Sequence, residues 1–303
     1  MLMKKKFEYV ESYFSVRKSS FKKRLFRWLT KGSSNLFLRT KDAISLNLLA
    51  LGVHEPGLTK LIGYYADSGY SDFFIDIGAN IGITSCQNGE AFKSVYMFEP
   101  NPYCFKILEV NTAMALDMNK CYLFNYGLGV KDHKSKLMVP KFNWGGGFIR
   151  DSLNSYGDKL LASKDGLDFI DERNYLSVEI EIKKGATVLG RIFNDLQSTN
   201  NVQGVVKIDV EGYEPVIIKE LAKVLPKNIK LKIIFESFDP SLDIKELSRS
   251  FDRNVNVKRL VKRLPWKDGA PGIVRGFCFK SIITDLSELT SDGACGDLVL
   301  ELD

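Results

Sequence analysis

The sequence predicts an α/β fold: a Rossmann-like, doubly wound, mostly parallel sheet with an antiparallel edge hairpin and a helical N-terminal extension. Apolar runs alternate with helix-compatible segments from 73 to 126 and again from 186 to 237, as in parallel sheets covered by helices. Two further strand-like runs, 255–264 and 276–286, follow one another without an intervening helix. They therefore predict an antiparallel hairpin at the sheet edge.

The first strand and the turn after it occupy residues 73–84. An apolar run contains Asp76 near its end, and Gly78 and Gly82 follow before a helix-compatible segment. The glycines allow a sharp turn and let a ligand approach main-chain N–H groups. The spacing is not that of a dinucleotide fingerprint, and Asp76 would repel a diphosphate but suit an ammonium group. S-adenosylmethionine, which carries ribose, adenine and an amino acid but no phosphate, fits this pattern. The alternative is an ordinary turn whose glycines serve packing only.

The second and third strands extend the same hypothesis. The run 94–99 ends at Glu99, and a carboxylate at the tip of the second strand can accept hydrogen bonds from ribose hydroxyls. The run 121–126 is followed by Gly127, and we expect the adenine ring near Asn125 and Gly127.

Length and composition predict one large domain, either alone or with an appendage. The chain has 303 residues, 45% of them apolar, which is enough for a full core. We expect the following segments: a basic N-terminal extension at 1–40, a main domain at 41–290 with a helical preamble at 41–70 and an insertion at 131–185, and a polar tail at 291–303.

Several classes of protein do not fit the sequence. No apolar run reaches the ~18–20 residues that span a bilayer, and no signal-peptide pattern follows the N-terminus. The five cysteines are scattered without a C-x-x-C pair, which favours a reducing, cytoplasmic location. Two histidines cannot build a histidine-rich metal site, and no metal is predicted.

Positive charge is concentrated at the N-terminus. Residues 1–31 contain ten Lys or Arg and two Glu, a net charge of +8, which leaves about −2 for the remaining chain. Aromatic residues are interleaved with these charges, so peripheral contact with an anionic membrane, on the inner face, is one hypothesis. The alternative is a helix that packs on the domain and keeps its lysines solvated. Nucleic acid is disfavoured because the rest of the chain is nearly neutral.

The insertion at 131–185 interrupts the alternation. Trp144 and Phe148 flank three consecutive glycines, and a strand pattern follows at 176–182. Such a segment can shape an acceptor pocket or act as a lid. The alternative is a surface hairpin with a flexible tip.

Three further acids lie at strand ends. Asp209 and Glu211 follow the strand that begins at 204, and Glu236 ends the strand at 230–237. Carboxyl ends of parallel strands meet at one sheet edge, where such groups raise one another's pKa and can act as a general base. They can also bind a divalent cation or cap the following helices. His54, at a helix junction near this edge, is a third catalytic candidate or a structural hydrogen-bonding residue.

Residues 74–82, 98–102 and 207–214 resemble the signature segments of FkbM-type methyltransferases, and the resemblance covers about 73–240. The third segment, a lysine-led strand closing in Asp-x-Glu-Gly-x-Glu, is the most specific. The resemblance implies a methyl donor, S-adenosylmethionine, and transfer to oxygen, often to hydroxyls of sugars or of macrolide-type products. The sequence departs from the family at 185–189, where the Asp that commonly follows Thr-Leu is missing.

The sequence thus predicts an S-adenosylmethionine-dependent O-methyltransferase that acts on a hydroxyl of a sugar, in a glycan or a glycolipid-linked saccharide. The residues expected to hold the donor are Asp76, Gly78, Asn80, Gly82, Glu99, Asn125 and Gly127. The base is expected to be Asp209 first and Glu236 second, with His54 as the remaining catalytic candidate. The alternatives are a nucleotide-sugar-dependent glycosyltransferase and a non-catalytic, membrane-associated binding protein.

Overall fold

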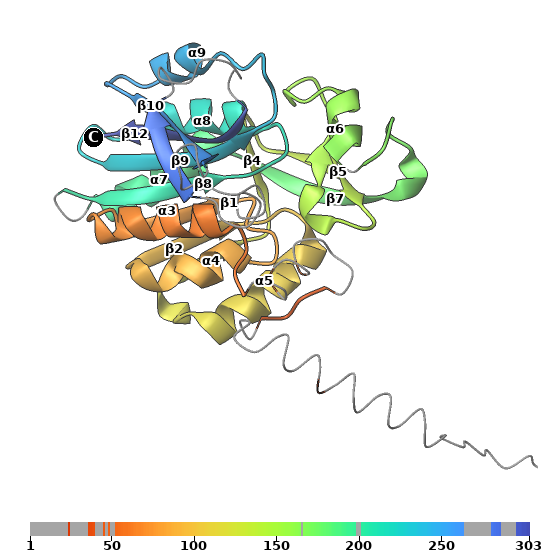
Figure 1. The fold of residues 1–303 in the computed structure, drawn as a ribbon, viewed down its shortest axis with the longest axis horizontal. Coiled ribbons are helices and arrows are strands. Elements are labelled where there is room, and N and C mark those ends of the chain that lie inside the picture. Colours follow the sequence, from red (N-terminus) through yellow and green to blue (C-terminus); the bar gives the residue numbers. More distant parts are fainter. Residues whose placement is uncertain are drawn as a thin grey trace, which may run out of the picture.

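A large sheet lies between two layers of helices in the computed structural model of the chain (Figure 1). The structure describes residues 24, 36–39, 45, 48, 52–164, 166–197, 201–263, 280–285 and 295–303. One layer contains α3 (Pro56–Asp67), α4 (Ile83–Asn88) and α5 (Pro102–Ala115). The other contains α7 (Gly185–Leu196), α8 (Glu214–Ala222) and α9 (Ile244–Arg249).

The large sheet has the order β11-β10-β12-β9-β8-β1-β2-β3. Its strands are β1 (Phe73–Ile77), β2 (Ser94–Phe98), β3 (Cys121–Phe124), β8 (Gln203–Ile208), β9 (Lys230–Ser237), β10 (Asn256–Arg263), β11 (Lys280–Asp285) and β12 (Gly296–Leu302). The ladders from β3 through β2, β1 and β8 to β9 are parallel. Strands β10 and β11 form the antiparallel pair at the edge. Both features were predicted from the sequence and are confirmed.

Strand β1 shows why these runs become central strands. All five of its residues are buried. Phe73, Ile75 and Ile77 join the core under α7 and α8, whereas Phe74 joins the core under α3 and α5. Successive side chains point to opposite faces of a strand, so a strand covered on both sides is continuously apolar.

The C-terminal residues depart from the prediction. The expectation of a polar tail at 291–303 is wrong, because β12 pairs antiparallel with both β9 and β10 inside the sheet. Leu298, Leu300 and Leu302 pack on one face and Val299 on the other. This apolar run is short and follows a polar stretch, and its place depends on pairing with strands far away in the sequence.

The insertion at 131–185 and the residues just before it form a second sheet, with the order β4-β7-β5-β6. Its strands are β4 (Gly127–Gly129), β5 (His133–Pro140), β6 (Phe148–Ile149) and β7 (Tyr175–Lys184), and α6 (Asp158–Lys164) lies between β6 and β7. Short 3-10 turns occur at Gly89–Ala91, Met118–Lys120, Trp144–Gly146 and Glu172–Asn174. The predicted third strand therefore ends early, since the chain leaves the large sheet after Phe124.

Little of the N-terminal region lies within the described residues. Helix α3 confirms the second half of the predicted helical preamble, and the segment 1–31 falls outside the description except for Arg24. Residues 36–39 run beside α5, where the side-chain amide of Asn111 donates to the carbonyl of Phe37 at 3.1 Å. In the described part of the chain, no helix has the length and apolar character of a membrane span.

Candidate active site

A cavity of about 240 Å³ opens at the carboxyl ends of the parallel strands. The sheet contributes residues at or just after the ends of β1, β2, β8 and β9, namely Gly78, Glu99, Asp209 and Glu236. The insertion contributes the opposite wall, including Trp144, the three glycines after it, and Lys164. The cavity therefore joins the acidic strand ends to the segment predicted to shape an acceptor pocket.

Glu99 lies at the sheet side of this cavity and is only 7% exposed. Its Oε2 accepts from the Asn80 N–H at 2.8 Å, and its Oε1 accepts from the Asn101 N–H at 2.7 Å. Burial raises the pKa of Glu99 to about 7, although the two backbone donors act in the opposite direction. Each carboxylate oxygen has a second lone pair, so the group can still accept from a ligand's hydroxyls.

The turn between β1 and α4 brings the main chain close to the end of β8. Gly78 has φ +83°, and a Cβ there would lie 1.9 Å from the carbonyl oxygen of Asp209. Asn80 adopts φ +52°, an uncommon conformation for a non-glycine residue. Its side-chain oxygen is buried in the cavity wall with no hydrogen-bond partner among the described residues. An acceptor left unpaired in a cavity suits a ligand that brings a donor, such as an ammonium or amino group.

Asp76 is not placed as predicted. Its side chain is fully buried and does not line the cavity. Instead it accepts from Ser85 Oγ at 2.7 Å and from Lys207 Nζ at 3.2 Å. Asp76 and Lys207 are register partners on β1 and β8, so the strand pairing itself brings the two charges together. The predicted direct contact between Asp76 and a ligand is therefore wrong. Asp76 instead stabilises the neighbouring ends of β1 and β8 through its ion pair with Lys207.

Of the other predicted donor-site residues, one lines the cavity and two lie outside it. Gly127 lines the cavity, and a Cβ there would meet Ile182 at 2.7 Å. Asn125 lies outside it and donates to the main-chain carbonyl of Glu99 at 2.8 Å. Gly82 also lies outside it, with φ +83° and Leu108 2.5 Å from where a Cβ would be. These two residues shape the loops that carry Glu99 and Asn80.

The predicted catalytic candidates all line the cavity: Asp209, Glu236 and His54. The side chain of Asp209 is 40% exposed, and its Oδ2 lies 3.4 Å from Lys207 Nζ. Burial raises the pKa of Glu236 to about 8, and the negative charges of Asp209, Asp297 and Glu55 add to the effect. His54 Nε2 lies 3.7 Å from the carboxylate of Glu55.

The loop after β8 is held in an unusual conformation. Glu211 has φ +52° and Gly212 has φ +98°. The carboxylate of Glu214 accepts from the N–H groups of Val210 and Gly212 at 3.0 and 2.9 Å. Burial raises the pKa of Glu214 to about 8, whereas the backbone N–H groups of Val210 and of Glu214 itself lower it. The acids around Gly212 therefore have two roles. Glu214 holds the strained loop through its hydrogen bonds, and Asp209 and Glu211 line the cavity.

Lys164, Trp144 and Glu55 line the cavity and were not assigned a role from the sequence. Trp144 stood out only through the glycines beside it, Glu55 only as the neighbour of His54 at a helix junction near the ligand end of the sheet, and Lys164 carried no local signal. Their position depends on how the insertion and α3 fold against the sheet. Within the described ranges, no three His, Cys, Asp or Glu side chains are grouped as metal ligands.

Comparison with known proteins gives one family match and a set of distant structural likenesses. The model of the methyltransferase FkbM domain matches residues 76–253. No curated protein matches the chain. The solved structure of the O-methyltransferase from Bacillus cereus in complex with SAH is 10% identical, with a TM-score of 0.43, over 92% of this chain and 97% of that one. The SAM-dependent methyltransferase from Agrobacterium tumefaciens is 8% identical, with a TM-score of 0.40, over 81% of this chain and 60% of that one.

The tRNA (m1A58) methyltransferase from Aquifex aeolicus is a third such likeness, 12% identical with a TM-score of 0.38, over 88% of this chain and 72% of that one. These structural likenesses are low, and the assignment depends on the family match. The protein is an S-adenosylmethionine-dependent methyltransferase with a Rossmann-like fold. It belongs to the family of the methyltransferase FkbM domain.

The cavity fits the methyl donor of that family. Glu99 offers carboxylate oxygens at the tip of β2, where ribose hydroxyls are expected. The unpaired side-chain oxygen of Asn80 offers an acceptor in the same wall. Gly127 and Leu128 supply an apolar surface beside them.

Proposed function

We propose that the protein transfers a methyl group to a hydroxyl oxygen of a sugar, in a glycan or a glycolipid-linked saccharide. One observation carries this proposal: a single cavity joins the donor-side residue Glu99 to carboxyl groups at the ends of two neighbouring strands. A hydroxyl is a weak nucleophile at neutral pH, and it needs a nearby proton acceptor more than an amine does.

The protein's own contribution is alignment and proton acceptance. S-adenosylmethionine supplies a methyl group on a positively charged sulfur, which leaves as a neutral thioether. Holding the acceptor oxygen in line with that methyl group can supply a large part of the rate enhancement. As the new oxygen–carbon bond forms, the hydroxyl O–H bond breaks and a carboxylate takes the proton.

Asp209 remains our first candidate for that base. It follows β8 directly, next to Gly78 in the turn after β1, so it lies between the donor-side turn and the acidic edge. Its Oδ2 lies 3.4 Å from Lys207 Nζ. The side chain of Asp209 is partly exposed and is therefore accessible to an acceptor.

Glu236 is the second candidate, and its merit is different. A base accepts protons best when its pKa is near the working pH, and the pKa of Glu236 is raised to about 8. His54 completes the set on the α3 side of the cavity. The three side chains thus line the same cavity, and the kinetics of single variants can show which of them is the base.

A saccharide acceptor is supported by the aromatic rim. Trp144 lines the cavity beside three glycines, and the Arg39 guanidinium lies 4.1 Å from its ring centre. An indole that lines the same cavity as the carboxyl groups offers an apolar surface, and the carboxyl groups offer hydrogen-bond acceptors, as a sugar ring requires.

Incubation with methyl-labelled donor and a panel of saccharides, lipid-linked saccharides and RNA tests the proposal. We expect label in a saccharide, with turnover lost in Asp209→Asn or Glu236→Gln. Asp252→Asn is the matched control, because Asp252 is exposed and forms an ion pair with surface Lys227 at 2.7 Å. Label on RNA or on nitrogen, with none on a saccharide hydroxyl, contradicts the proposal. Transfer of sugar from a nucleotide sugar would restore the glycosyltransferase alternative.

A further inference from the structure

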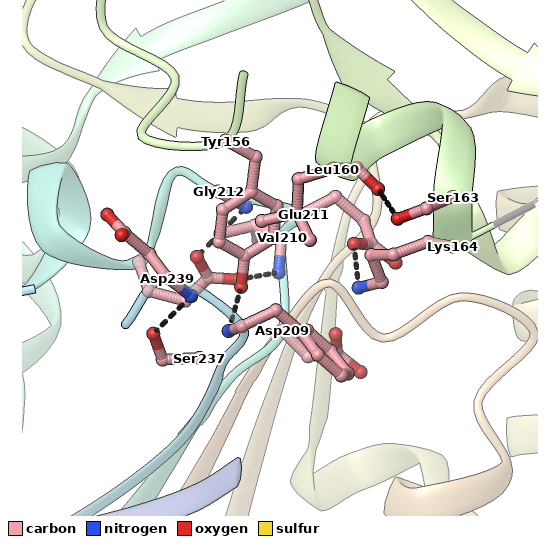
Figure 2. A network of polar contacts seen from close by, with 12 residues as sticks. Tyr156, Leu160, Ser163, Lys164, Asp209, Val210, Glu211, Gly212, Ser237 and Asp239 are labelled. Carbon is pink, nitrogen blue, oxygen red and sulfur yellow. Dashed lines mark hydrogen bonds and ion pairs between the residues drawn. The ribbon is translucent and has the colours of Figure 1, made fainter. Parts of the chain in front are cut away.

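Lys164 is the cation that the insertion places in the cavity wall. It is the last residue of α6, and its ammonium forms an ion pair with the Glu211 carboxylate (Figure 2). The two side chains are only 20% and 13% exposed. The ammonium also lies 4.0 Å from the centre of the Phe238 ring, a cation–π distance. A lysine held from two sides in a largely buried position has one defined orientation.

The surroundings keep this lysine charged. Burial lowers the pKa of Lys164, but the carboxylate of Glu211, and then those of Asp209 and Glu236, outweigh burial and raise it overall. The ammonium form therefore persists throughout the neutral range.

The insertion grips the same loop at further points. The side-chain amide of Asn154 donates to the Glu211 carbonyl at 3.0 Å. Ser155 donates its N–H and its hydroxyl to the Gly212 carbonyl, at 2.9 and 3.0 Å. The strained backbone at Glu211 and Gly212 is thus fixed by contacts from the insertion, and the Lys164 ion pair is the charged member of that set.

The charged groups that face Glu236 come from several elements. Asp209 follows β8, Asp297 is the register partner of Glu236 on β12, and Glu55 precedes α3. Burial and these three carboxylates disfavour a negative charge on Glu236, whereas Lys164 on α6 favours it. The remaining titratable residues that line the cavity are Glu211, which is paired with Lys164, His54, which is near Glu55, and Glu99 and Tyr213. Burial raises the pKa of Tyr156 in the insertion, and the charge of Glu236 adds to that effect.

We propose that Lys164 is a positioning residue for methyl transfer: through its ion pair with Glu211 it couples the insertion to the acidic strand ends and keeps Glu236 able to accept a proton. This inference rests on the proposed function and names a residue that acts through other side chains. The insertion then does more than cover the acceptor, because it also sets the charge state of the groups beneath it.

Titration of the Glu236 carboxyl by NMR, on protein with ¹³C-labelled glutamate and assigned with Glu236→Gln, tests the proposal without any acceptor. Removing an opposite charge at short range shifts a carboxyl titration by roughly 1 unit or more. We expect Lys164→Met to move the Glu236 midpoint upward by about that amount. Lys164→Arg, which retains the charge, should restore the wild-type midpoint.

Lys159→Met is the matched control, because Lys159 is an exposed lysine on the same helix. Lys164→Gln gives a second neutral variant if the Met variant does not fold. An unchanged Glu236 midpoint in the neutral Lys164 variants, or an equal shift in Lys159→Met, overturns the proposal. With an acceptor in hand, the rising limb of the kcat/KM profile should move to higher pH with the same variants.

The role of Lys164 and the proposed O-methylation can be refuted separately. If Glu236 shifts as expected but no hydroxyl is methylated, the coupling through Lys164 stands and the proposed O-methylation is wrong. If hydroxyls are methylated and Glu236 does not respond to Lys164, the proposed O-methylation stands and the role of Lys164 is wrong.

Discussion

Glu99 provides the sharpest prediction for donor binding. In the free protein its two oxygens accept from Asn80 N–H at 2.8 Å and Asn101 N–H at 2.7 Å, and its pKa is about 7. Two hydrogen bonds from ribose hydroxyls to this carboxylate contribute about 1.5–3 kcal/mol together. We therefore expect Glu99→Ala to weaken the binding of S-adenosylhomocysteine by roughly ten- to a hundredfold.

The pH dependence of this affinity has a defined sign. Hydroxyl donors favour the ionised carboxylate, so below pH 7 the free protein must release a proton before both bonds form. Donor affinity should be fully present above pH 7 and fall as the pH drops through it, by up to about tenfold per unit. Glu99→Ala should lack this dependence.

Calorimetry between pH 5.5 and 7.5, on both proteins, measures the effect. The ligand's own titration affects both proteins equally, so the difference between wild type and Glu99→Ala reports on Glu99 alone. Glu109→Ala is the matched control, since Glu109 is an exposed glutamate on neighbouring α5. Glu99→Gln should lie between wild type and Glu99→Ala, because one oxygen still accepts. Equal affinity of wild type and Glu99→Ala refutes the donor-site assignment.

Three further predictions concern the strand ends and the N-terminus. Asp209→Asn should leave donor affinity near normal and lower turnover by ~10²–10⁴-fold in steady-state assays; unchanged turnover would move the role of base to Glu236 or His54. Lys207→Met should cost about 3–5 kcal/mol in urea unfolding, because it leaves the fully buried Asp76 without its ion pair; a loss below ~1 kcal/mol would show that the pair is dispensable. Deleting residues 1–31, which carry +8, should abolish salt-sensitive co-sedimentation with anionic liposomes, and equal sedimentation of both forms would sink the membrane hypothesis.

The sequence predicted the features that depend on short stretches of chain. The strand ending before Gly78, the strand tip at Glu99 and the acids after β8 and at the end of β9 each carry a local pattern, and the structure brings all of them to one cavity. The family resemblance stated from residues 74–82, 98–102 and 207–214 is confirmed by the match over 76–253.

What the sequence did not predict depends on contacts between distant segments. Asp76 has the position of a ligand-binding acid, yet its register partner on β8 is a lysine, and their pairing buries it. Lys164 enters the cavity only because the insertion folds back onto the loop at Glu211. Strand β12 takes its place through pairing with β9, which a short apolar run at the end of a polar stretch does not reveal.

The identity of the methylated atom is the most direct test of the proposed function. Donor labelled with ¹³C in the methyl group, incubated with the wild-type protein and lipid-linked saccharides, should give a methyl ether carbon resonance on a sugar. The same incubation with Asp209→Asn or Glu236→Gln should give a much weaker signal. A labelled methyl group on nitrogen, on carbon or on RNA, with no methyl ether on any saccharide, would contradict the account.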